Sequence, residues 1–89
     1  MDDKLEMLRR EIDATDAELA ALFVKRMGLC REIAAVKAER GMPTCVPQRE
    51  AEVLDKVATA VGEELSPYAR RLWEKMMELS REYQKSHEK

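Results

Sequence analysis

A proline-free stretch of 39 residues, from Asp2 to Arg40, constrains this chain more than any other feature. Its single glycine, Gly28, is tolerated inside a helix at about 1 kcal/mol relative to alanine. We therefore predict one continuous helix. At 1.5 Å per residue it would be a rod of ~58 Å, whereas a compact chain of this size has a radius of gyration near ~12 Å. The rod must project beyond its own globule.

Apolar side chains form a stripe along this predicted helix. They alternate in steps of three and four residues, the spacing of a helix-packing seam, and two polar residues, Thr15 and Arg26, occupy seam positions. The apolar members are Leu5, Leu8, Ile12, Leu19, Leu22, Leu29, Ile33 and Val36. Shorter helices cannot cover such a rod and also bury their own stripes, so we predict an intertwined homodimer.

Two shorter helices follow the rod. Gly41 ends the first helix, and residues 41–46 form a loop. Pro47 suits the first position of a second helix that continues to Gly62, and Ser66 begins a third helix with a side-chain cap. The third helix has a predicted buried stripe of Ala69, Leu72, Trp73, Met76, Leu79 and Tyr83. We therefore predict an all-α fold of three helices in a single domain, residues 1–89.

The composition excludes several classes of small protein. Lysine and arginine total 16 against 18 aspartate and glutamate, without a long run of either sign, so no nucleic-acid-binding surface is expected. No apolar run is long enough for a signal peptide or a membrane span, so we expect a cytoplasmic protein without a membrane partner. Cys30 and Cys45 lack the paired spacing of a zinc site, and we expect neither a metal nor a disulfide framework.

Arg26 and Lys37 need an explanation beyond helix formation. A buried, unpaired guanidinium would be unfavourable, so an anionic group should meet Arg26: a ligand, or a glutamate such as Glu32 or Glu52. Arg26 could also fix the dimer register. Lys37 falls within about 20° of the same helix face, roughly 16 Å along the axis. Arg9 lies about 25 Å from Arg26 in the other direction, so in an antiparallel dimer it could reach the partner's site.

Further polar residues occur on the two shorter helices. Arg49 lies in the first turn of the second helix, where it opposes the helix dipole, which indicates a role with a ligand, whereas Glu50 agrees with the dipole. Ser80 and Gln84 are one turn apart and face inward on the third helix. Simpler explanations exist: Lys37 could be a solvated lysine, Glu50 could pair with a neighbouring cation, and Ser80 and Gln84 could lie at the edge of the apolar face.

Short motifs run along nearly the whole chain. They are Leu8-Arg9-x-x-Ile12-Asp13-x-x-Asp16, Leu22-x-x-x-Arg26, Ile33-Ala34-x-x-Lys37, Gly41-x-Pro43, Pro47-x-Arg49-Glu50 and Ser80-x-x-x-Gln84. In this order and spacing they resemble the all-helical, AroQ-type chorismate mutases. The resemblance implies conversion of chorismate to prephenate, in phenylalanine and tyrosine biosynthesis, by a concerted rearrangement without metal, cofactor or covalent intermediate.

The resemblance also implies roles for individual residues. Lys37 and Gln84 would donate hydrogen bonds to the ether oxygen of the breaking bond, and Glu50 would accept one from the ring hydroxyl. Two arginines, Arg26 and Arg9 of the other subunit, would hold the substrate carboxylates. Arg49 would assist electrostatically and Ser80 would add a polar contact. The complete substrate-binding set is Arg9, Arg26, Lys37, Val46, Arg49, Glu50, Ser80 and Gln84.

Val46 departs from the pattern of the family, which usually has aspartate before the Pro-x-Arg-Glu segment. An aspartate there would cap the second helix, and its loss could cost ~1 kcal/mol, although the backbone N–H of Val46 stays available to a ligand. Relatives with the same fold act on isochorismate as pyruvate lyases or on 4-amino-4-deoxychorismate as mutases. These reactions, and a non-catalytic helical dimerisation module, are the alternative functions.

Overall fold

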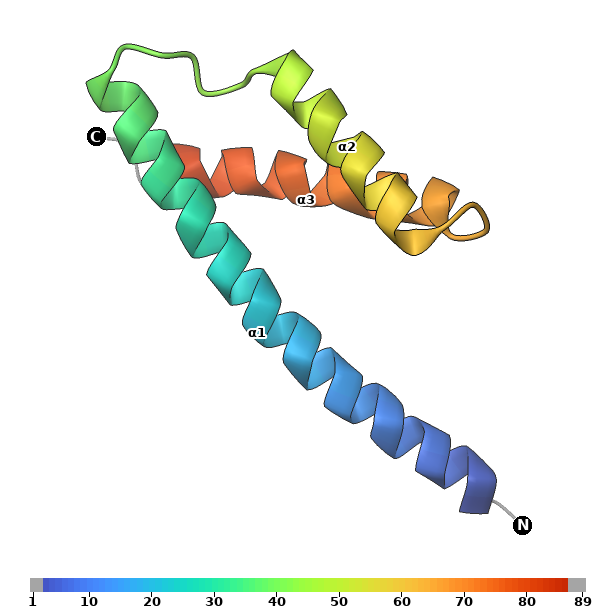
Figure 1. The fold of residues 1–89 in the computed structure, drawn as a ribbon. Coiled ribbons are helices and arrows are strands. Elements are labelled where there is room, and N and C mark those ends of the chain that lie inside the picture. The colour runs from blue at the N-terminus through green and yellow to red at the C-terminus, as the bar shows by residue number, and fades with distance from the viewer. Residues whose placement is uncertain (1–2, 87–89) are drawn as a thin grey trace.

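The computed structural model describes residues 3–86, which form three α-helices and no strand (Figure 1). They are α1 (Asp3–Glu39), α2 (Pro47–Val61) and α3 (Ser66–Ser86). The predicted all-α fold with one long and two shorter helices is therefore confirmed. Asp2, the predicted start of the first helix, lies outside the described residues.

The C-terminal end of α1 is closed by the glycine that the sequence analysis selected. Gly41 has a φ of 65°, the left-handed conformation that glycine adopts without steric penalty. The backbone N–H of Met42 donates to the carbonyl of Lys37 at 2.8 Å, and that of Gly41 donates to Ala38 at 3.2 Å. These two bonds form a Schellman motif, which satisfies two of the last carbonyls of α1 and turns the chain towards α2.

The two ends of α2 also follow the prediction. Val46 is the N-cap in an extended conformation and its side chain makes no capping hydrogen bond, while Pro47 takes the first turn. Gly62 closes the helix with a φ of 87°. Since an apolar cap leaves orphan N–H groups to water, the start of α2 is held by the fixed φ of proline rather than by a side chain.

The predicted side-chain cap of α3 is wrong. Ser66 is already the first helical residue, and its backbone N–H donates to the carbonyl of Gly62 at 2.9 Å. The carbonyl of Leu65 accepts the next bond, from Ala69, also at 2.9 Å. The turn after α2 thus continues directly into α3, and the hydroxyl of Ser66 makes no hydrogen bond to a described residue.

The helices are arranged around α3. It packs against α2 along its N-terminal half and crosses the C-terminal part of α1, whereas α1 and α2 do not pack against each other (Figure 1). The N-terminal half of α1 extends away as a bare rod. The chain measures 60 × 29 × 15 Å with a radius of gyration of 16.6 Å, well above the ~12 Å of a compact chain, which confirms that the rod projects.

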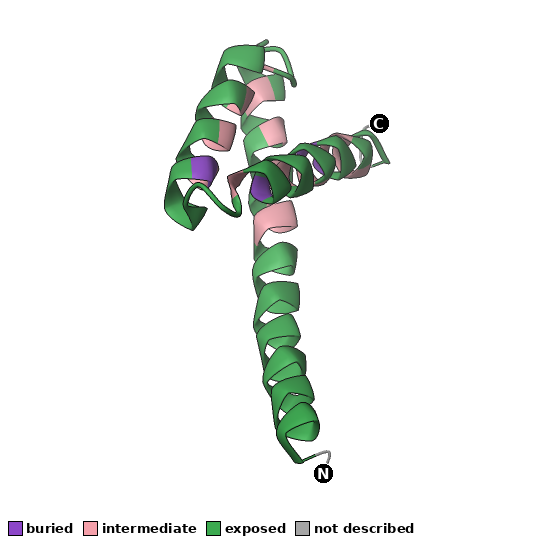
Figure 2. Cartoon of the chain, turned by 90° about the vertical axis from the view of Figure 1, so that its right-hand side faces the viewer, coloured by how far each residue is buried: buried purple, intermediate pink, exposed green. Residues whose placement is uncertain are grey.

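The core within one chain is very small. In the part of the chain that the structure describes, the buried residues are Ala58 on α2 and Ala69, Met77 and Ser80 on α3 (Figure 2). The predicted stripe of α3 is therefore displaced by part of a turn. Leu72 and Leu79 are exposed, because the face between Ala69 and Ser80 turns towards the other two helices.

The apolar stripe of α1 is exposed along its whole length. Every residue from Asp3 to Lys25 is exposed, and the eight apolar seam residues retain 41–60% of their accessible surface. The chain exposes 7580 Å² in total, whereas a compact protein of this mass exposes about 5400 Å². Within residues 3–86, no helix combines the length and apolar character that a membrane span requires.

Candidate functional site

A pocket of about 260 Å³ lies where the three helices and the α1–α2 loop come together. It is lined by Arg26, Cys30, Ile33, Lys37, Thr44, Arg49, Glu50, Val53, Met77, Ser80, Arg81 and Gln84. Six of these residues belong to the predicted site set. The structure therefore brings together Arg26, Lys37, Arg49, Glu50, Ser80 and Gln84, although they span 59 positions of the sequence.

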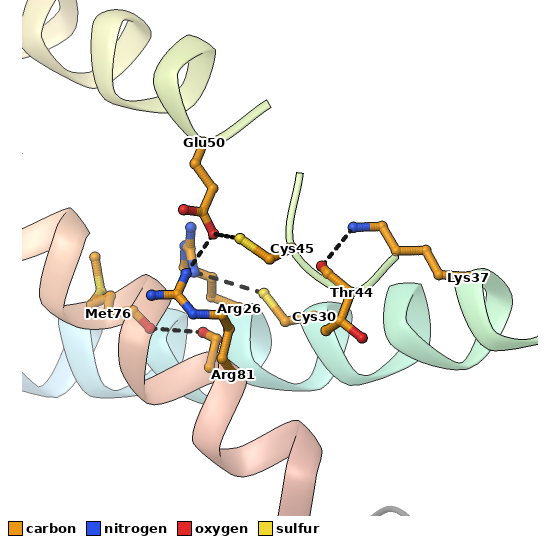
Figure 3. A network of polar contacts seen from close by, with 9 residues as sticks. Arg26, Cys30, Lys37, Thr44, Cys45, Glu50, Met76 and Arg81 are labelled. Atoms are coloured by element: carbon orange, nitrogen blue, oxygen red, sulfur yellow. Dashed lines mark hydrogen bonds and ion pairs between the residues drawn. The ribbon is translucent and has the colours of Figure 1, made fainter. Parts of the chain in front are cut away.

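The floor of the pocket is the face of α1 that carries Arg26 and Lys37 (Figure 3). Arg26 is half-buried, and its Nη1 contacts the thiol of Cys30, one turn later, at 3.7 Å. No described carboxylate forms an ion pair with it, so pairing with Glu32 or Glu52 does not occur within the chain. Lys37 donates from Nζ to the backbone carbonyl of Thr44 at 3.1 Å, which ties the loop to α1.

The first turn of α2 supplies Arg49 and Glu50. The pair is anchored by Pro47, which starts the helix just before them. Arg49 is 62% exposed and lies 3.7 Å from Glu52, an exposed i,i+3 pair of small energetic value. Glu50 is half-buried and accepts hydrogen bonds from Arg81 and from the thiol of Cys45, the latter at 3.7 Å. The carboxylate thus points inward while Arg49 lies at the rim.

The inward face of α3 supplies Ser80 and Gln84, as predicted. Ser80 is only 4% exposed, and its hydroxyl lies 2.8 Å from the carbonyl of Met76 and 3.4 Å from the sulfur of Met27. Gln84 donates from Nε2 to the carbonyl of Cys30 on α1 at 3.2 Å. This bond fixes the amide at the crossing of α1 and α3, and it gives the inward amide the partner that its burial requires.

Arg81 is a pocket residue that the sequence analysis missed. It is half-buried and reaches from α3 to the carboxylate of Glu50 on α2 (Figure 3). Its position gave a usable signal, because it follows the buried Met77 by four residues and precedes Gln84 by three. Residues at these spacings share a helix face, so an arginine at this position is as unusual on an inward face as Ser80 and Gln84 are.

Two predicted site residues lie away from the pocket lining. Arg9 is exposed on the projecting half of α1, 17 positions before Arg26, which corresponds to about 25 Å along the helix. Val46 is the half-buried N-cap of α2, and its backbone N–H donates to no described residue. A single chain therefore assembles six of the eight predicted residues.

The charge of the pocket suits a small anion. Among the described residues, four cationic side chains, Arg26, Lys37, Arg49 and Arg81, line it together with one carboxylate, Glu50. A larger hollow of about 450 Å³ lies at the α2–α3 turn, but its one arginine, Arg70, already pairs with Asp55 at 3.0 Å. We therefore take the smaller, cation-rich pocket as the candidate site.

Comparison with known proteins identifies the family of this chain. A family model described as chorismate mutase type II matches residues 8–85, which includes every residue of the pocket. The chain belongs to the chorismate mutase type II family. The resemblance inferred from the motifs is therefore confirmed. No solved structure gave a significant match.

Several curated relatives of the family match part of this chain. The bifunctional chorismate mutase/prephenate dehydratase of Aquifex aeolicus is 36% identical over 55 residues, which cover 62% of this chain and 15% of the relative. The T-protein of Enterobacter agglomerans is 42% identical over 62 residues, 66% of this chain and 17% of the relative. The chorismate mutase of Methanocaldococcus jannaschii is 32% identical over 57 residues, 64% and 58% respectively. The matches thus span less than two thirds of each relative.

Proposed function

We propose that this chain catalyses the rearrangement of chorismate to prephenate, a step of phenylalanine and tyrosine biosynthesis. The observation that carries the proposal is the convergence of Arg26, Lys37, Glu50 and Gln84, from three different helices, on one pocket of a chain that belongs to this family. No metal or cofactor enters the proposed reaction, because it is an internal exchange of bonds.

The electrostatics of the pocket match the reaction. Chorismate is a dicarboxylate, and breaking its ether C–O bond places negative charge on the ether oxygen. Cations that clamp the carboxylates hold the reactive shape but stabilise substrate and transition state alike. Rate enhancement needs donors aimed at the ether oxygen, where the charge develops.

Lys37 and Gln84 are the proposed donors to the ether oxygen. Each already gives one hydrogen bond to a backbone carbonyl, Lys37 to Thr44 and Gln84 to Cys30. An ammonium carries three donor hydrogens and an amide nitrogen two, so each group keeps at least one for the substrate. The protein bonds therefore fix the donor atoms before the substrate arrives, which is the preorganisation that such catalysis requires.

The remaining pocket residues have supporting roles in the proposal. Arg26 has no carboxylate partner among the described residues and is assigned to one substrate carboxylate. Glu50 is assigned to the ring hydroxyl, Arg49 at the rim to electrostatic attraction, and Ser80 to a polar contact near a carboxylate. The free backbone N–H of Val46 is assigned to a ligand contact at the pocket edge.

We further propose that two copies of the chain form an intertwined homodimer. One chain exposes about 2200 Å² more surface than a compact protein of equal mass. If each of two subunits buried this excess, the total buried area would fall within the range of obligate dimer interfaces. The exposed stripe of α1 supplies the apolar surface. Arg9 of the partner subunit would then hold the second substrate carboxylate.

The decisive experiment follows the loss of chorismate ultraviolet absorbance with purified protein and identifies the product. Prephenate supports the proposal. Release of pyruvate would instead show an isochorismate-type lyase, and turnover of 4-amino-4-deoxychorismate alone would show the related mutase. A protein that dimerises but converts none of these substrates would be a dimerisation module.

Replacing Arg26 tests the site. Arg26→Ala should lower turnover by two orders of magnitude or more, about 3 kcal/mol, because a charge-assisted carboxylate contact is lost, while the dimer persists. Unchanged turnover would contradict the proposed site. A single domain over residues 1–89 and a cytoplasmic location remain predictions from the sequence.

A further inference from the structure

The contact between Arg81 and Glu50 joins two helices inside the candidate pocket. Nη1 of Arg81 on α3 donates to Oε2 of Glu50 on α2, and the two side chains are only 38% and 30% exposed. The thiol of Cys45, in the loop before α2, approaches the same Oε2 at 3.7 Å (Figure 3). Both contacts therefore hold one oxygen of the carboxylate.

The other oxygen of Glu50 has no hydrogen-bond partner within residues 3–86. Oε1 accepts no hydrogen bond from any described residue, although Glu50 lines the pocket. A carboxylate held through one oxygen has little freedom to rotate, so its second oxygen keeps a fixed direction. An acceptor fixed in advance binds a hydroxyl without a further loss of conformational entropy.

From this geometry we infer that Arg81 is a positioning residue for Glu50, and that it works through Oε2 to present Oε1 to the ring hydroxyl of the substrate. The inference rests on the proposed function, since it names the group that Oε1 receives. It adds a residue to the site that neither the motifs nor the family resemblance supplied.

Charge gives Arg81 a second effect on the same carboxylate. An ionised Glu50 close to a dianionic substrate would repel it, and the repulsion is strong in a partly desolvated pocket. The adjacent guanidinium offsets that repulsion while it leaves Oε1 free to accept. Loss of Arg81 should therefore weaken both substrate binding and the orientation of the bound ring.

A second ion pair between the same helices provides a matched control. Arg70 of α3 pairs with Asp55 of α2 at 3.0 Å, outside the candidate pocket. Arg70→Met removes one α2–α3 ion pair just as Arg81→Met does. A role of Arg81 in helix packing alone would make the two variants behave alike.

The test is a double-mutant cycle on the 89-residue chain with chorismate as the probe. Arg81→Met should lower kcat/KM by about tenfold or more, the loss expected for one charge-assisted hydrogen bond, whereas Arg70→Met should change it less than twofold. In a Glu50→Gln background, Arg81→Met should have little further effect, because the carboxylate through which it works is gone. Equal losses in both backgrounds would overturn the inference and indicate that Arg81 meets the substrate itself.

Arg81→Lys completes the test without a large change in the pocket. The observed contact uses a single guanidinium nitrogen, so an ammonium should reproduce it and restore kcat/KM to within about threefold. A loss as large as that of Arg81→Met would overturn the inference, provided that circular dichroism shows the same helicity. Failure of the unsubstituted protein to convert chorismate would refute the proposed function instead, so the two failures are distinguishable.

Discussion

The two halves of α1 have the same helical backbone and opposite surroundings. Residues 3–25 are exposed throughout, whereas the part from Arg26 onward contributes half-buried residues to the contact with α3 and to the pocket (Figure 2). A helix of this length is not stabilised by intrinsic propensity alone, since helical stability in proteins comes mostly from packing of an apolar face. The first half therefore needs a surface that one chain does not provide.

The two halves of α1 differ most clearly on a single face of the helix. At 100° per residue, Leu8, Leu19, Arg26 and Lys37 all fall within about 20° of one another. Apart from Thr15, this face is apolar in the exposed half, and it is cationic in the half that lines the pocket. A partner that covers the apolar stretch would thus end at the pocket, so in the proposed homodimer one helix face would serve both the subunit contact and the site.

Leu19→Lys should have the largest effect of the substitutions in the exposed half of α1. Leu19 is 58% exposed in one chain, and in the proposed dimer a lysine there would bury a charge in an apolar contact. We expect dissociation to monomers at micromolar concentration and loss of nearly all turnover. Sedimentation and the chorismate absorbance assay measure the two effects on the same sample.

Val24→Lys is the matched control for that experiment. Val24 is 70% exposed and lies about 160° around the helix from Arg26, on the opposite face. The same new charge there should leave both the dimer and turnover intact. A Leu19→Lys protein that stays dimeric and active would show that the apolar stripe is not the dimer contact.

Mixing two inactive variants tests whether the exposed half of α1 serves the partner's pocket. Arg9→Ala and Arg26→Ala should each reduce turnover by orders of magnitude. Unfolding and refolding them together in equal amounts yields mixed dimers, in which one of two sites has both arginines. Recovery should approach about one quarter of the original activity, from half of the dimers with one of two sites intact.

One result of the mixing experiment would contradict the shared site. If Arg9 served the pocket of its own chain, every site of a mixed dimer would lack one arginine, and no activity would return. Each variant refolded alone is the control, and it should stay inactive. Arg9→Ala with undiminished turnover would remove Arg9 from the site altogether.

Most of the fold could be predicted from the sequence because its signals are local. A long proline-free stretch, Gly41, Pro47 and Gly62 set the helix bounds through backbone chemistry alone. The start of α3 was less well predicted. The ends of α1 and α2 each depend on the backbone conformation of one glycine. The start of α3 depends instead on how the preceding turn joins the helix, so the cap expected at Ser66 was wrong.

The candidate site was predictable only in part. Residues at unexpected positions, such as the inward Gln84, could be recognised from periodicity alone. Arg81 could not be paired with Glu50 in this way, because their contact joins α3 to α2 and depends on how the two helices cross. The predicted buried stripe of α3 was misplaced for the same reason, since Leu72 and Leu79 follow helical spacing but are exposed.

Gln84→Ala tests the contact of α3 with the covered half of α1. The substitution removes the hydrogen bond from α3 to the carbonyl of Cys30, which should cost about 1 kcal/mol of stability, and removes a proposed transition-state donor, which should lower kcat roughly 100-fold. Urea unfolding and steady-state kinetics measure these separately. Gln48→Ala, at an exposed amide of α2, should change neither, and a Gln84→Ala enzyme with normal kcat would exclude the donor role.

Gly28→Ala should produce the smallest effect, at the boundary between the two halves. Gly28 lies inside α1, and a methyl group there would meet no atom within 4 Å beyond its chain neighbours and the adjoining backbone of the helix. Alanine should therefore stabilise the protein by about 0.5–1 kcal/mol in urea unfolding without changing turnover.

Ala20→Gly, in the exposed half, is the reciprocal change. It should destabilise the protein by a similar amount only if residues 3–25 unfold together with the rest of the molecule. Since we attribute their order to the dimer, the destabilisation should appear with dimeric protein and vanish in the Leu19→Lys background. An unchanged effect of Ala20→Gly in that background would show that the exposed half of α1 is held within its own chain.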